Sequence, residues 1–399
     1  MIRSTKHHIK DLNKNKSDRY KDFLNEYDWY CKKVLTWIWN NGYKDFCIVE
    51  NKLDIPKYID YKEFDFNTRL SARARSSACI QVCQIIKSAV EKQRRRLWVK
   101  TNKDSNVKMV KFSEPKPTFV KPSLSSKCCE FEYTDGKFLG YVKLQSLGKE
   151  FGVIKIPIIR HPRSQGKMKA GFVFSMESIQ VSWDREPIKS KTINKNVVAI
   201  DQGFKDIATL SDGQVTPKKC HHGHTLESII EKITKKKKGS KGFKKSVDHR
   251  KNFVNYSINQ LNFSKAKEVR LERIVNIGFG KRVCRKMSHW CNTEIRDKIK
   301  SKCEELEVPV IEQSCSYRSQ RCSSCGLVKR SNRKGKEYKC KNCGVCLDSD
   351  YNASLNHLGD LPPFPFNLLK RKLNLGTGFF WFEQGFFFDA ERRVPCCQN

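Results

Sequence analysis

The chain has 399 residues, enough for two or three domains with buried cores, which excludes disorder of the whole chain. Its 79 lysines and arginines outnumber its 42 acidic residues and leave a formal net charge of +37, so a polyanionic partner is expected. The N-terminus is polar without a leader pattern and no long apolar run occurs, so we expect nucleic acid as the partner and exclude a membrane protein. The 18 cysteines are spread along the sequence, so we expect reduced, metal-binding thiols and exclude a secreted disulfide scaffold.

Residues 1 to 110 are predicted to be mainly helical. A short strand is expected over residues 2–9, and helices between Lys14 and about Leu97. The last helix carries four apolar residues at helix-like spacing, Ile80, Cys83, Ile86 and Val90. Six arginines flank this stripe, Arg69, Arg73, Arg75, Arg94, Arg95 and Arg96. The pattern predicts one face packed on the core and another facing phosphates, with a solvated face as the ordinary alternative.

Strand signals replace helical ones between residues 115 and 187. Five segments rich in β-branched and aromatic residues are separated by glycine, proline or charged turns, namely CCEFEY, FLGYVKL, GVIKIPII, GFVFSM and IQVSW. Five short strands predict a small β-barrel, a fold that commonly binds nucleic acid but proves no function by itself. We interpret this region as a binding platform.

A first candidate acid lies in the stretch NVVAIDQGFKDIATLSDGQ. Residues 197–200 form an apolar run with high strand propensity, and Asp201 follows it directly. Gly203 permits a tight turn, and residues 207–213 are predicted as the returning strand of a hairpin. A carboxylate at the end of a buried strand is a candidate site residue, whereas a single Asp-x-Gly is more commonly just a turn.

A second acid lies on a later strand. After a helix predicted between Val247 and Lys267, the segment EVRLERIVNI is a strand candidate that contains Glu272. Burial of a glutamate is costly unless it is paired or binds a metal, so Glu272 is a candidate site residue. The alternative, which the strand alone slightly favours, is an exposed edge with Glu272 paired to arginine. A helix at residues 288–306 and a short strand, VPVIEQ, follow.

Two close cysteine pairs come next, Cys322 with Cys325 and Cys340 with Cys343, and fourteen residues separate the inner two. Each pair forms a turn that can direct two thiolates at one ion, which is the arrangement of a tetrahedral zinc site. A closed set of four thiolates leaves no open position, so a structural zinc is predicted. Cys346 is a spare thiol nearby.

A third acid follows the cysteines. The segment DSDYNASLNHL is predicted to begin a helix, with Asp348, Ser349 or Asp350 as its cap. The order is then an acid at a strand end, an acid on a later strand and an acid at a helix start. Three such carboxylates suit a two-metal phosphodiester nuclease, in which Mg²⁺ ions roughly 4 Å apart activate water and stabilise the leaving oxygen.

These motifs together resemble a known family. AIDQGFKDIATLSDG, RLERI, SQRCSSCG, YKCKNCG and DYNASLNH occur in the order seen in TnpB, so the chain resembles the TnpB nucleases of insertion sequences and the compact type V CRISPR effectors related to them. The specific likeness spans residues 197–357. It implies that Asp201, Glu272 and Asp350 are the catalytic acids that bind magnesium, with Asp348 as the runner-up for the third.

The resemblance also implies a fold class and a domain organisation. We expect a multidomain α+β protein with a helical recognition lobe, a wedge-like β-barrel and a RuvC-like domain of the RNase H fold into which a zinc ribbon is inserted. The expected boundaries are a first wedge strand at 1–13, the recognition lobe at 14–110, the wedge barrel at 111–193, the RuvC-like domain at 194–317 and 348–360, the zinc ribbon, which binds target nucleic acid, at 318–347, and an aromatic tail at 361–399.

The function that the resemblance implies is an RNA-guided DNA endonuclease of RuvC type, dependent on two Mg²⁺ and containing one structural Zn²⁺. Its expected partners are a guide RNA and double- and single-stranded target DNA, without a membrane, and its expected state is a monomer or a dimer. We expect it in the cytoplasm or nucleoid of a prokaryote or in a phage-infected cell. The alternatives are a cleavage-deficient RNA-guided DNA-binding protein or repressor, and a transposon-associated zinc-ribbon DNA-binding protein.

Three further segments each have a purely structural interpretation and a functional one. The basic run at residues 235–250 is predicted as a loop that contacts the guide or target backbone. The histidines of HHGH after Cys220 are predicted to form a loop in preference to a metal site. For the aromatic tail, with LPPFPF and GFFWFEQGFFF, core packing is favoured over base stacking or a dimer interface.

Overall fold

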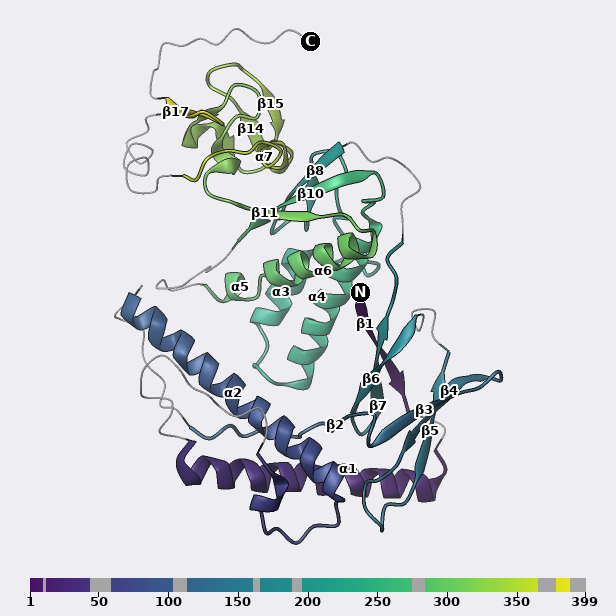
Figure 1. The fold of residues 1–399 in the computed structure, drawn as a ribbon. Coiled ribbons are helices and arrows are strands. Elements are labelled where there is room, and N and C mark those ends of the chain that lie inside the picture. Colours follow the sequence, from purple (N-terminus) through teal and green to yellow (C-terminus); the bar gives the residue numbers. More distant parts are fainter. Residues whose placement is uncertain are drawn as a thin grey trace. The chain divides into compact units, whose positions relative to one another are not determined.

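The structure is a computed structural model, and it describes residues 1–9, 12–43, 59–102, 113–160, 166–188, 196–274, 284–364 and 378–387. The chain divides into two compact units, Met1–Glu186 and Pro187–Asn399 (Figure 1). Each unit has its own clusters of buried apolar residues. No helix within the described ranges combines the length and the apolar character that crossing a bilayer requires.

Two long helices form the helical part of the first unit, α1 at Lys14–Ile38 and α2 at Ala72–Asn102, and Figure 1 shows them crossing. A π-helical turn, Trp39–Tyr43, follows α1, and a 3-10 turn, Tyr61–Glu63, precedes α2. Asn13 begins α1 by accepting a hydrogen bond from the backbone N–H of Lys16 at 3.0 Å. The helices predicted between Lys14 and about Leu97 are therefore present, while their assignment to a recognition lobe stays a prediction.

The apolar stripe of α2 is confirmed at three of its four positions. Cys83, Ile86 and Val90 are buried, but the Ile80 side chain is 40% exposed and Cys79 is buried in its place. The reason is periodicity, because spacings of four, three and four from Cys79 follow the helical repeat, whereas two successive spacings of three from Ile80 drift off the core face. The prediction was wrong by one residue at this end.

Two of the arginines that flank the apolar stripe of α2 stabilise the unit internally. Arg69 forms ion pairs with Asp22 at 2.7 Å and with Glu26 at 3.2 Å. The guanidinium of Arg75 lies 4.6 Å from the centre of the Tyr61 ring. For these two side chains, the expectation of a phosphate-facing role is replaced by structural contacts.

The described part of the first unit also contains seven strands, β1 Ile2–His8, β2 Ser123–Leu124, β3 Cys129–Tyr133, β4 Phe138–Leu144, β5 Ile154–Ile159, β6 Lys167–Phe174 and β7 Ser178–Asp184. All five segments predicted between residues 115 and 187 form strands. Their hydrogen bonds give two antiparallel sheets, in the orders β1-β7-β6-β2 and β3-β4-β5. The first strand of the chain thus pairs with the last strand of this unit, while closure of the strands into one barrel stays a prediction.

The second unit is built on a mixed sheet of four strands, β8 Asn196–Asp201, β9 Thr209–Leu210, β10 Ala266–Arg273 and β11 Val310–Ser314. Their order is β11-β10-β8-β9. Strand β10 runs parallel to both β8 and β11, and β9 returns antiparallel to β8 as the predicted hairpin. The two central strands, β8 and β10, are therefore the ones that carry the first two predicted acids.

Among the residues that the structure describes, four helices accompany this sheet, α3 Leu226–Thr234, α4 Lys241–Gln260, α5 Arg285–Ser288 and α6 Asn292–Glu305. Apolar residues of α3, α4 and α6 share one buried cluster with β8 and β10 (Figure 1). The helix predicted between Val247 and Lys267 begins earlier, because the Ser240 hydroxyl caps it by accepting from the Phe243 N–H at 3.1 Å. Residues 241–250 of the basic run thus belong to helix α4, which corrects the loop expectation for this part, and Lys267 belongs to β10.

The cysteine region and the tail form small sheets around helix α7 (Ser349–Asn356). One sheet joins β13 Arg333–Lys334, β14 Glu337–Lys339 and β15 Cys346–Asp348, and the other joins β12 Leu327–Val328, β16 Phe379–Phe382 and β17 Gly385–Phe387. The 3-10 turn Arg330–Asn332 lies between β12 and β13, and a second one, Arg318–Gln320, precedes β12.

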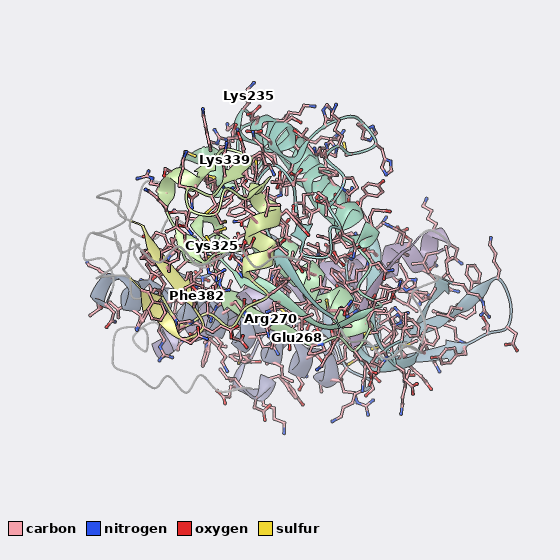
Figure 2. The ribbon with its side chains drawn as sticks, turned by 90° about the horizontal axis from the view of Figure 1, so that it is seen from above. Lys235, Glu268, Arg270, Cys325, Lys339 and Phe382 are labelled. Atoms are coloured by element: carbon pink, nitrogen blue, oxygen red, sulfur yellow. The ribbon has the colours of Figure 1, made fainter. Side chains whose placement is uncertain are left out.

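The described part of the aromatic tail packs on the cysteine region. Strand β16 pairs with β12, and the Trp381 N–H donates to the Gly326 carbonyl at 3.0 Å. Phe380 shares a buried cluster with Cys322, Cys325 and Cys340. Phe382 packs against this cluster, and Figure 2 shows it near Cys325. Core packing, the favoured expectation for this tail, is confirmed for residues 378–387.

Candidate active site and cysteine cluster

Asp201 is the last residue of β8, and its side chain is buried. The chain turns sharply after it at Gly203. A Cβ atom at Gly203 would lie 2.3 Å from the carbonyl oxygen of Asp206, closer than any side chain tolerates. Glycine at this position therefore lets the turn bring the following residues beside Asp201.

Glu272 lies on the central strand β10, so the alternative of an exposed edge strand is wrong. Its side chain is buried, and its Oε1 accepts a hydrogen bond of 2.6 Å from the backbone N–H of Gln202. The Gln202 side chain donates to the Glu272 carbonyl oxygen at 3.1 Å. Gln202 thereby ties the end of β8 to β10, directly beside both acids.

Asp350 stands in the first turn of α7, and Asp348 caps that helix. The Asp348 carboxylate accepts hydrogen bonds from the N–H groups of Asp350 at 2.9 Å and Tyr351 at 3.1 Å. The Asp350 carboxyl group is buried and points toward the end of β8, because its Oδ2 would lie 3.4 Å from a Cβ atom at Gly203. The geometry thus separates the two aspartates, with Asp348 in the capping role and Asp350 in the site.

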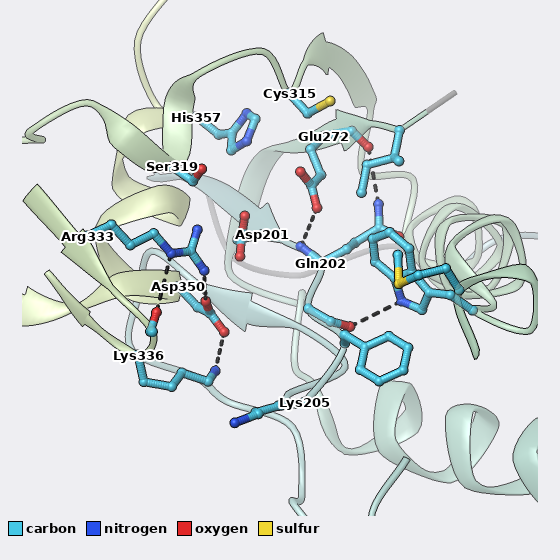
Figure 3. Close-up of a pocket in the computed structure, with 16 residues that line it drawn as sticks. Asp201, Gln202, Lys205, Glu272, Cys315, Ser319, Arg333, Lys336, Asp350 and His357 are labelled. Carbon is cyan, nitrogen blue, oxygen red and sulfur yellow. Dashed lines mark hydrogen bonds and ion pairs between the residues drawn. The ribbon is translucent and has the colours of Figure 1, made fainter. Parts of the chain in front are cut away.

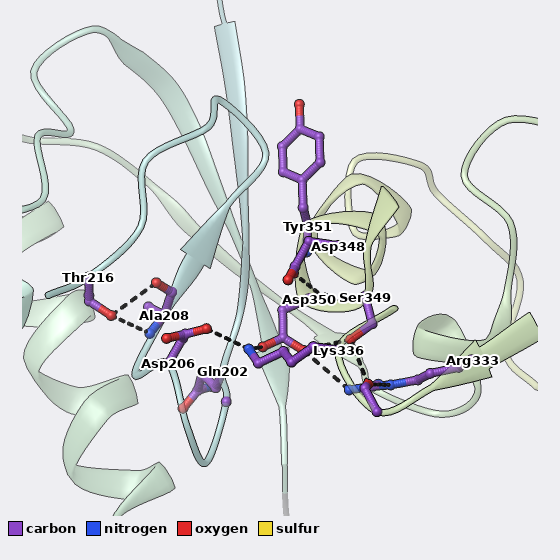
Figure 4. A network of polar contacts seen from close by, with 12 residues as sticks. Gln202, Asp206, Ala208, Thr216, Arg333, Lys336, Asp348, Ser349, Asp350 and Tyr351 are labelled. Carbon is purple, nitrogen blue, oxygen red and sulfur yellow. Dashed lines mark hydrogen bonds and ion pairs between the residues drawn. The ribbon is translucent and has the colours of Figure 1, made fainter. Parts of the chain in front are cut away.

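Two cations hold Asp350. Its carboxylate forms an ion pair with Arg333 at 3.2 Å and a second, shorter one with Lys336. Lys336 also pairs with Asp206 at 2.5 Å, so one ammonium bridges the turn after β8 and the start of α7 (Figure 4). Both cations come from the β13–β14 hairpin of the cysteine region.

The three predicted acids line one cavity of about 550 Å³ (Figure 3). Burial raises the pKa values of Asp201 and Glu272, and the negative charges of the neighbouring acids raise both further. None of the ion pairs found among the described residues involves Asp201 or Glu272. Two buried carboxyl groups are thus placed together without a protein cation of their own, which is a costly arrangement unless a metal ion or protons neutralise it.

His357 also lines this cavity, although no role was predicted for it from the sequence. Its ring nitrogen and carboxylate oxygens of Asp201 and Glu272 all lie within 4.8 Å of one another. The side chain is 1% exposed, and burial together with the Arg318 guanidinium lowers the pKa of His357 to about 3. A signal was present in the sequence, because His357 follows Asp350 by seven residues, two helical turns along the same face.

The four predicted cysteines converge. The sulfur atoms of Cys322 and Cys343 are 3.6 Å apart and those of Cys325 and Cys340 are 3.5 Å apart, and all four lie within 4.8 Å of one another. A tetrahedral zinc with Zn–S bonds of about 2.3 Å requires sulfur atoms roughly 3.8 Å apart. The cluster therefore fits a structural zinc. Cys346 is exposed on β15 and is not part of this group.

Two asparagines of the DYNASLNH segment fasten α7 to the cysteine cluster. The Asn352 side chain donates to the Arg321 carbonyl at 2.8 Å and accepts from the Ser323 N–H at 3.0 Å. Asn356 donates to the same Arg321 carbonyl at 2.7 Å. Since Arg321 and Ser323 flank Cys322, these hydrogen bonds hold the cysteine cluster and the helix that carries Asp350 together.

The HHGH segment forms a turn, as predicted, but it lies beside a fifth side chain that the sequence did not indicate. His249 of α4 lies 3.4 Å through its Nε2 from the Cys220 sulfur. The rings of His222 and His224 are each centred 5.7 Å from that of His249. Their nitrogen atoms do not meet at one point as those of a bound ion's ligands would.

A family model described as "Cas12f1-like, TNB domain" matches residues 293–357. The chain is 30% identical over 136 residues to the CRISPR-associated endodeoxyribonuclease Cas12f1 of Sulfoacidibacillus thermotolerans, which is 34% of this chain and 31% of that protein. It is 24% identical over 134 residues to Cas12f1 of Syntrophomonas palmitatica, 32% of this chain and 26% of the relative. The matched segment thus spans less than a third of the length of these curated relatives.

A solved structure shares the fold over most of the chain. The effector in a Cas12f1–sgRNA–target DNA complex matches with a TM-score of 0.52 at 14% identity, covering 87% of this chain and 83% of that one. Together with the sequence matches, this likeness confirms the predicted resemblance to compact type V effectors and to TnpB-like proteins.

Proposed function

We propose that this chain is an RNA-guided DNA endonuclease that hydrolyses target phosphodiester bonds by RuvC-like chemistry. The observation that carries the proposal is that the buried acids Asp201, Glu272 and Asp350, which come from two central strands and one helix, line the same cavity. The relatives named as endodeoxyribonucleases and the effector solved with guide RNA and target DNA support the same function. The formal charge of +37 supports a nucleic acid partner, because phosphate backbones bind through neutralising cations.

The residues present fit divalent magnesium. Carboxylate oxygens are the hard donors that Mg²⁺ prefers, and Asp201 and Glu272 lie together without an ion-pairing cation of their own among the described residues. Asp201, Glu272 and Asp350 would hold the ions. When bound, such ions supply an activated water and charge stabilisation for the leaving oxygen.

The chain's own side chains prepare the site for this chemistry. Gln202 fixes the orientation of the Glu272 carboxylate through its backbone N–H. Arg333 and Lys336 bring positive charge to the cavity wall, where a phosphate has to enter. The depth of the three acids excludes bulk water and strengthens each electrostatic interaction with the reacting group.

The remaining segments take roles from the same proposal. Helices within residues 14–110 and strands within residues 111–193 form the proposed recognition lobe and wedge, which bind guide and target backbones. The sheet of the second unit is the proposed RuvC-like domain of RNase H type, at 194–317 and 348–360. The zinc-bearing module at 318–347 orients the helix of the third acid and is proposed to bind target nucleic acid.

The test is a cleavage assay with the RNA that copurifies when the protein is expressed beside its native neighbouring DNA. Asp201→Ala should abolish DNA cleavage while RNA binding stays within about twofold of the unaltered protein, because the acid acts on the scissile phosphate alone. Asp297→Ala, which removes an exposed acid on α6, is the matched control and should cleave normally. Retained cleavage by Asp201→Ala, or the absence of any discrete copurifying RNA, would overturn the proposal.

One observation favours a second candidate, an RNA-guided DNA-binding protein that does not cleave. Asp350 carries ion pairs to Arg333 and Lys336, and these cations compete with a metal ion for its oxygens. If the unaltered protein binds guide-matched DNA but leaves it intact at saturating Mg²⁺, this second function replaces the first.

A further inference from the structure

His357 is a buried polar side chain in the wall of the cavity. Its ring is 1% exposed, and among the described residues its Nδ1 atom has no hydrogen-bond partner. Buried imidazole nitrogens normally make such bonds, so an unpartnered one requires a physical explanation. Packing alone does not supply it, because an apolar side chain of similar size would fill this space without leaving a nitrogen unpaired.

The position of His357 supplies the explanation. Helix α7 places Asp350 in its first turn and His357 at its C-terminal cap, two turns later on the same face. Both line the same cavity, and Figure 3 shows the His357 ring on the opposite side of Asp201 from Asp350 and Lys336. On that side, one of its two ring nitrogens lies within 4.8 Å of carboxylate oxygens of both Asp201 and Glu272.

Among the described residues, no ion pair joins the His357 ring to Asp201 or Glu272, so the ring is not already paired with either acid. The Arg318 guanidinium is buried near His357 and donates to the carbonyl oxygens of Ser314 and Gly359, at 3.0 and 3.3 Å. An imidazole next to two carboxylates is a combination that proteins use to bind divalent metals.

We propose that His357 is a nitrogen ligand of a divalent metal ion that Asp201 and Glu272 also hold. The proposed nuclease needs a metal at these acids, and the inference rests on that site but goes beyond it, because it makes the site a mixed oxygen and nitrogen site. Mg²⁺ prefers oxygen donors alone, whereas first-row transition ions accept imidazole readily. The site is therefore expected to select Mn²⁺ over Mg²⁺ more strongly than three carboxylates would.

The ligand assignment can be measured without any cleavage assay. In full-length, zinc-loaded protein freed of RNA by high salt, bound Mn²⁺ should show ¹⁴N coupling from an imidazole in pulsed electron paramagnetic resonance spectra. The coupling should disappear in His357→Leu and persist in His249→Leu, a matched loss of a histidine outside the cavity. Mn²⁺ bound at the site without ¹⁴N coupling in the unaltered protein would overturn the proposal, and this measurement does not depend on any variant folding.

Affinity gives a second, independent readout. His357→Leu should bind Mn²⁺ roughly tenfold more weakly, with a smaller change for Mg²⁺, since loss of metal-supporting residues typically costs 10- to 100-fold in affinity. His357→Gln, which retains a polar group, provides the same comparison if the leucine variant does not fold. Equal losses for the two ions, or none, would contradict a nitrogen ligand.

The outcomes also separate this inference from the proposed function. An Asp201→Asn variant that no longer binds Mn²⁺, together with ¹⁴N coupling in the unaltered protein and no DNA cleavage, would retain the ligand set and reject the nuclease. Cleavage with Mn²⁺ bound but without ¹⁴N coupling would retain the nuclease and reject His357 as a ligand.

Discussion

Gly203 shows how closely single residues determine the shape of the cavity. The turn that it makes brings Asp206 within reach of Lys336 and brings the backbone near Asp350. Its neighbour Gln202 binds Glu272 through both its backbone and its side chain. Gln202 and Gly203 directly follow Asp201 in the chain, and Gln202 also holds Glu272, which lies 70 residues further on.

Gly203→Ala is predicted to destabilise the second unit. The new methyl group would meet the Asp206 carbonyl oxygen at 2.3 Å, so the turn has to shift at a cost of about 1–3 kcal/mol. Thermal or chemical unfolding measures this directly. Gly136→Ala is the control, because no atom lies within 4 Å of a Cβ atom there, and its change should stay within about 0.5 kcal/mol. Equal stability of the two variants would refute the close approach.

The buried acids also predict how stability depends on pH. Because the folded protein raises the pKa values of Asp201 and Glu272 above their ordinary values near 4, it binds more protons than the unfolded chain above that pH. The free energy of unfolding of metal-free protein should therefore fall as pH rises from about 4 through the raised pKa values.

Mg²⁺ should reverse this fall, because it replaces the protons at the carboxylates. Melting curves at pH 5 and pH 8, with and without Mg²⁺, measure both effects. Asp201→Asn should flatten the pH dependence of the metal-free protein. The assignment would be contradicted if the metal-free protein were more stable at pH 8 than at pH 5 and Asp201→Asn removed that difference in the free energy of unfolding.

At the scale of elements, the β13–β14 hairpin and helix α7 together contribute one part of the cavity wall. The hairpin contributes Arg333 and Lys336, and α7 contributes Asp350 and His357. Each cation of the hairpin stabilises the third acid in the absence of metal but competes with metal for the same oxygens. The elements that border the site thus set its metal affinity as well as its shape.

Lys336→Gln is predicted to tighten binding of the divalent ion, by about tenfold if one ion pair with Asp350 has to break first. Isothermal titration with Mg²⁺ or Mn²⁺ measures the change. Lys334→Gln makes the same charge change two residues away on an exposed position of the hairpin and should have little effect. If both variants bind the ion equally well, Lys336 does not compete for Asp350.

Sequence patterns predicted the features that depend on residues close together in the chain. The two cysteine pairs and the acids at a strand end, on a strand and at a helix start were found because spacing and propensity determine them. The phase of the α2 stripe at Ile80 and the start of α4 were missed, since the first depends on a single position of the repeat and the second on one serine cap. His357 and the Lys336 contacts escaped because burial and ion pairs between distant segments arise only in the folded chain.

At the scale of the whole molecule, the chain consists of two units with separate cores. All residues of the largest buried cluster in the first unit precede Glu186, and the clusters that support the acids and the cysteines lie after Pro187. The acids, His357 and the four cysteines all belong to the second unit. The proposed metal chemistry is therefore contained in one unit, while the helices and two sheets of the other are left for proposed recognition.

The second unit, residues 187–399, is predicted to fold alone and to bind one zinc ion and the divalent ion of the cavity. Metal analysis and cooperative melting of this fragment test the prediction. Chelation of the zinc should release the cysteine module before the sheet, because the module's buried cluster is separate from that of β8 and β10. A fragment that is unfolded with zinc present would show that the first unit is needed for its stability.

The pairing of β16 with β12 bears on any attempt to shorten the protein. Ending the chain after Asp360 would strip the partner from Val328 and uncover the apolar side chains that Phe379 and Trp381 now bury. An open strand beside an uncovered apolar patch is a template for association between copies. A trimmed version meant for compact delivery would thus trade length for solubility, and a replacement strand or polar substitutions at that edge would have to come with the cut.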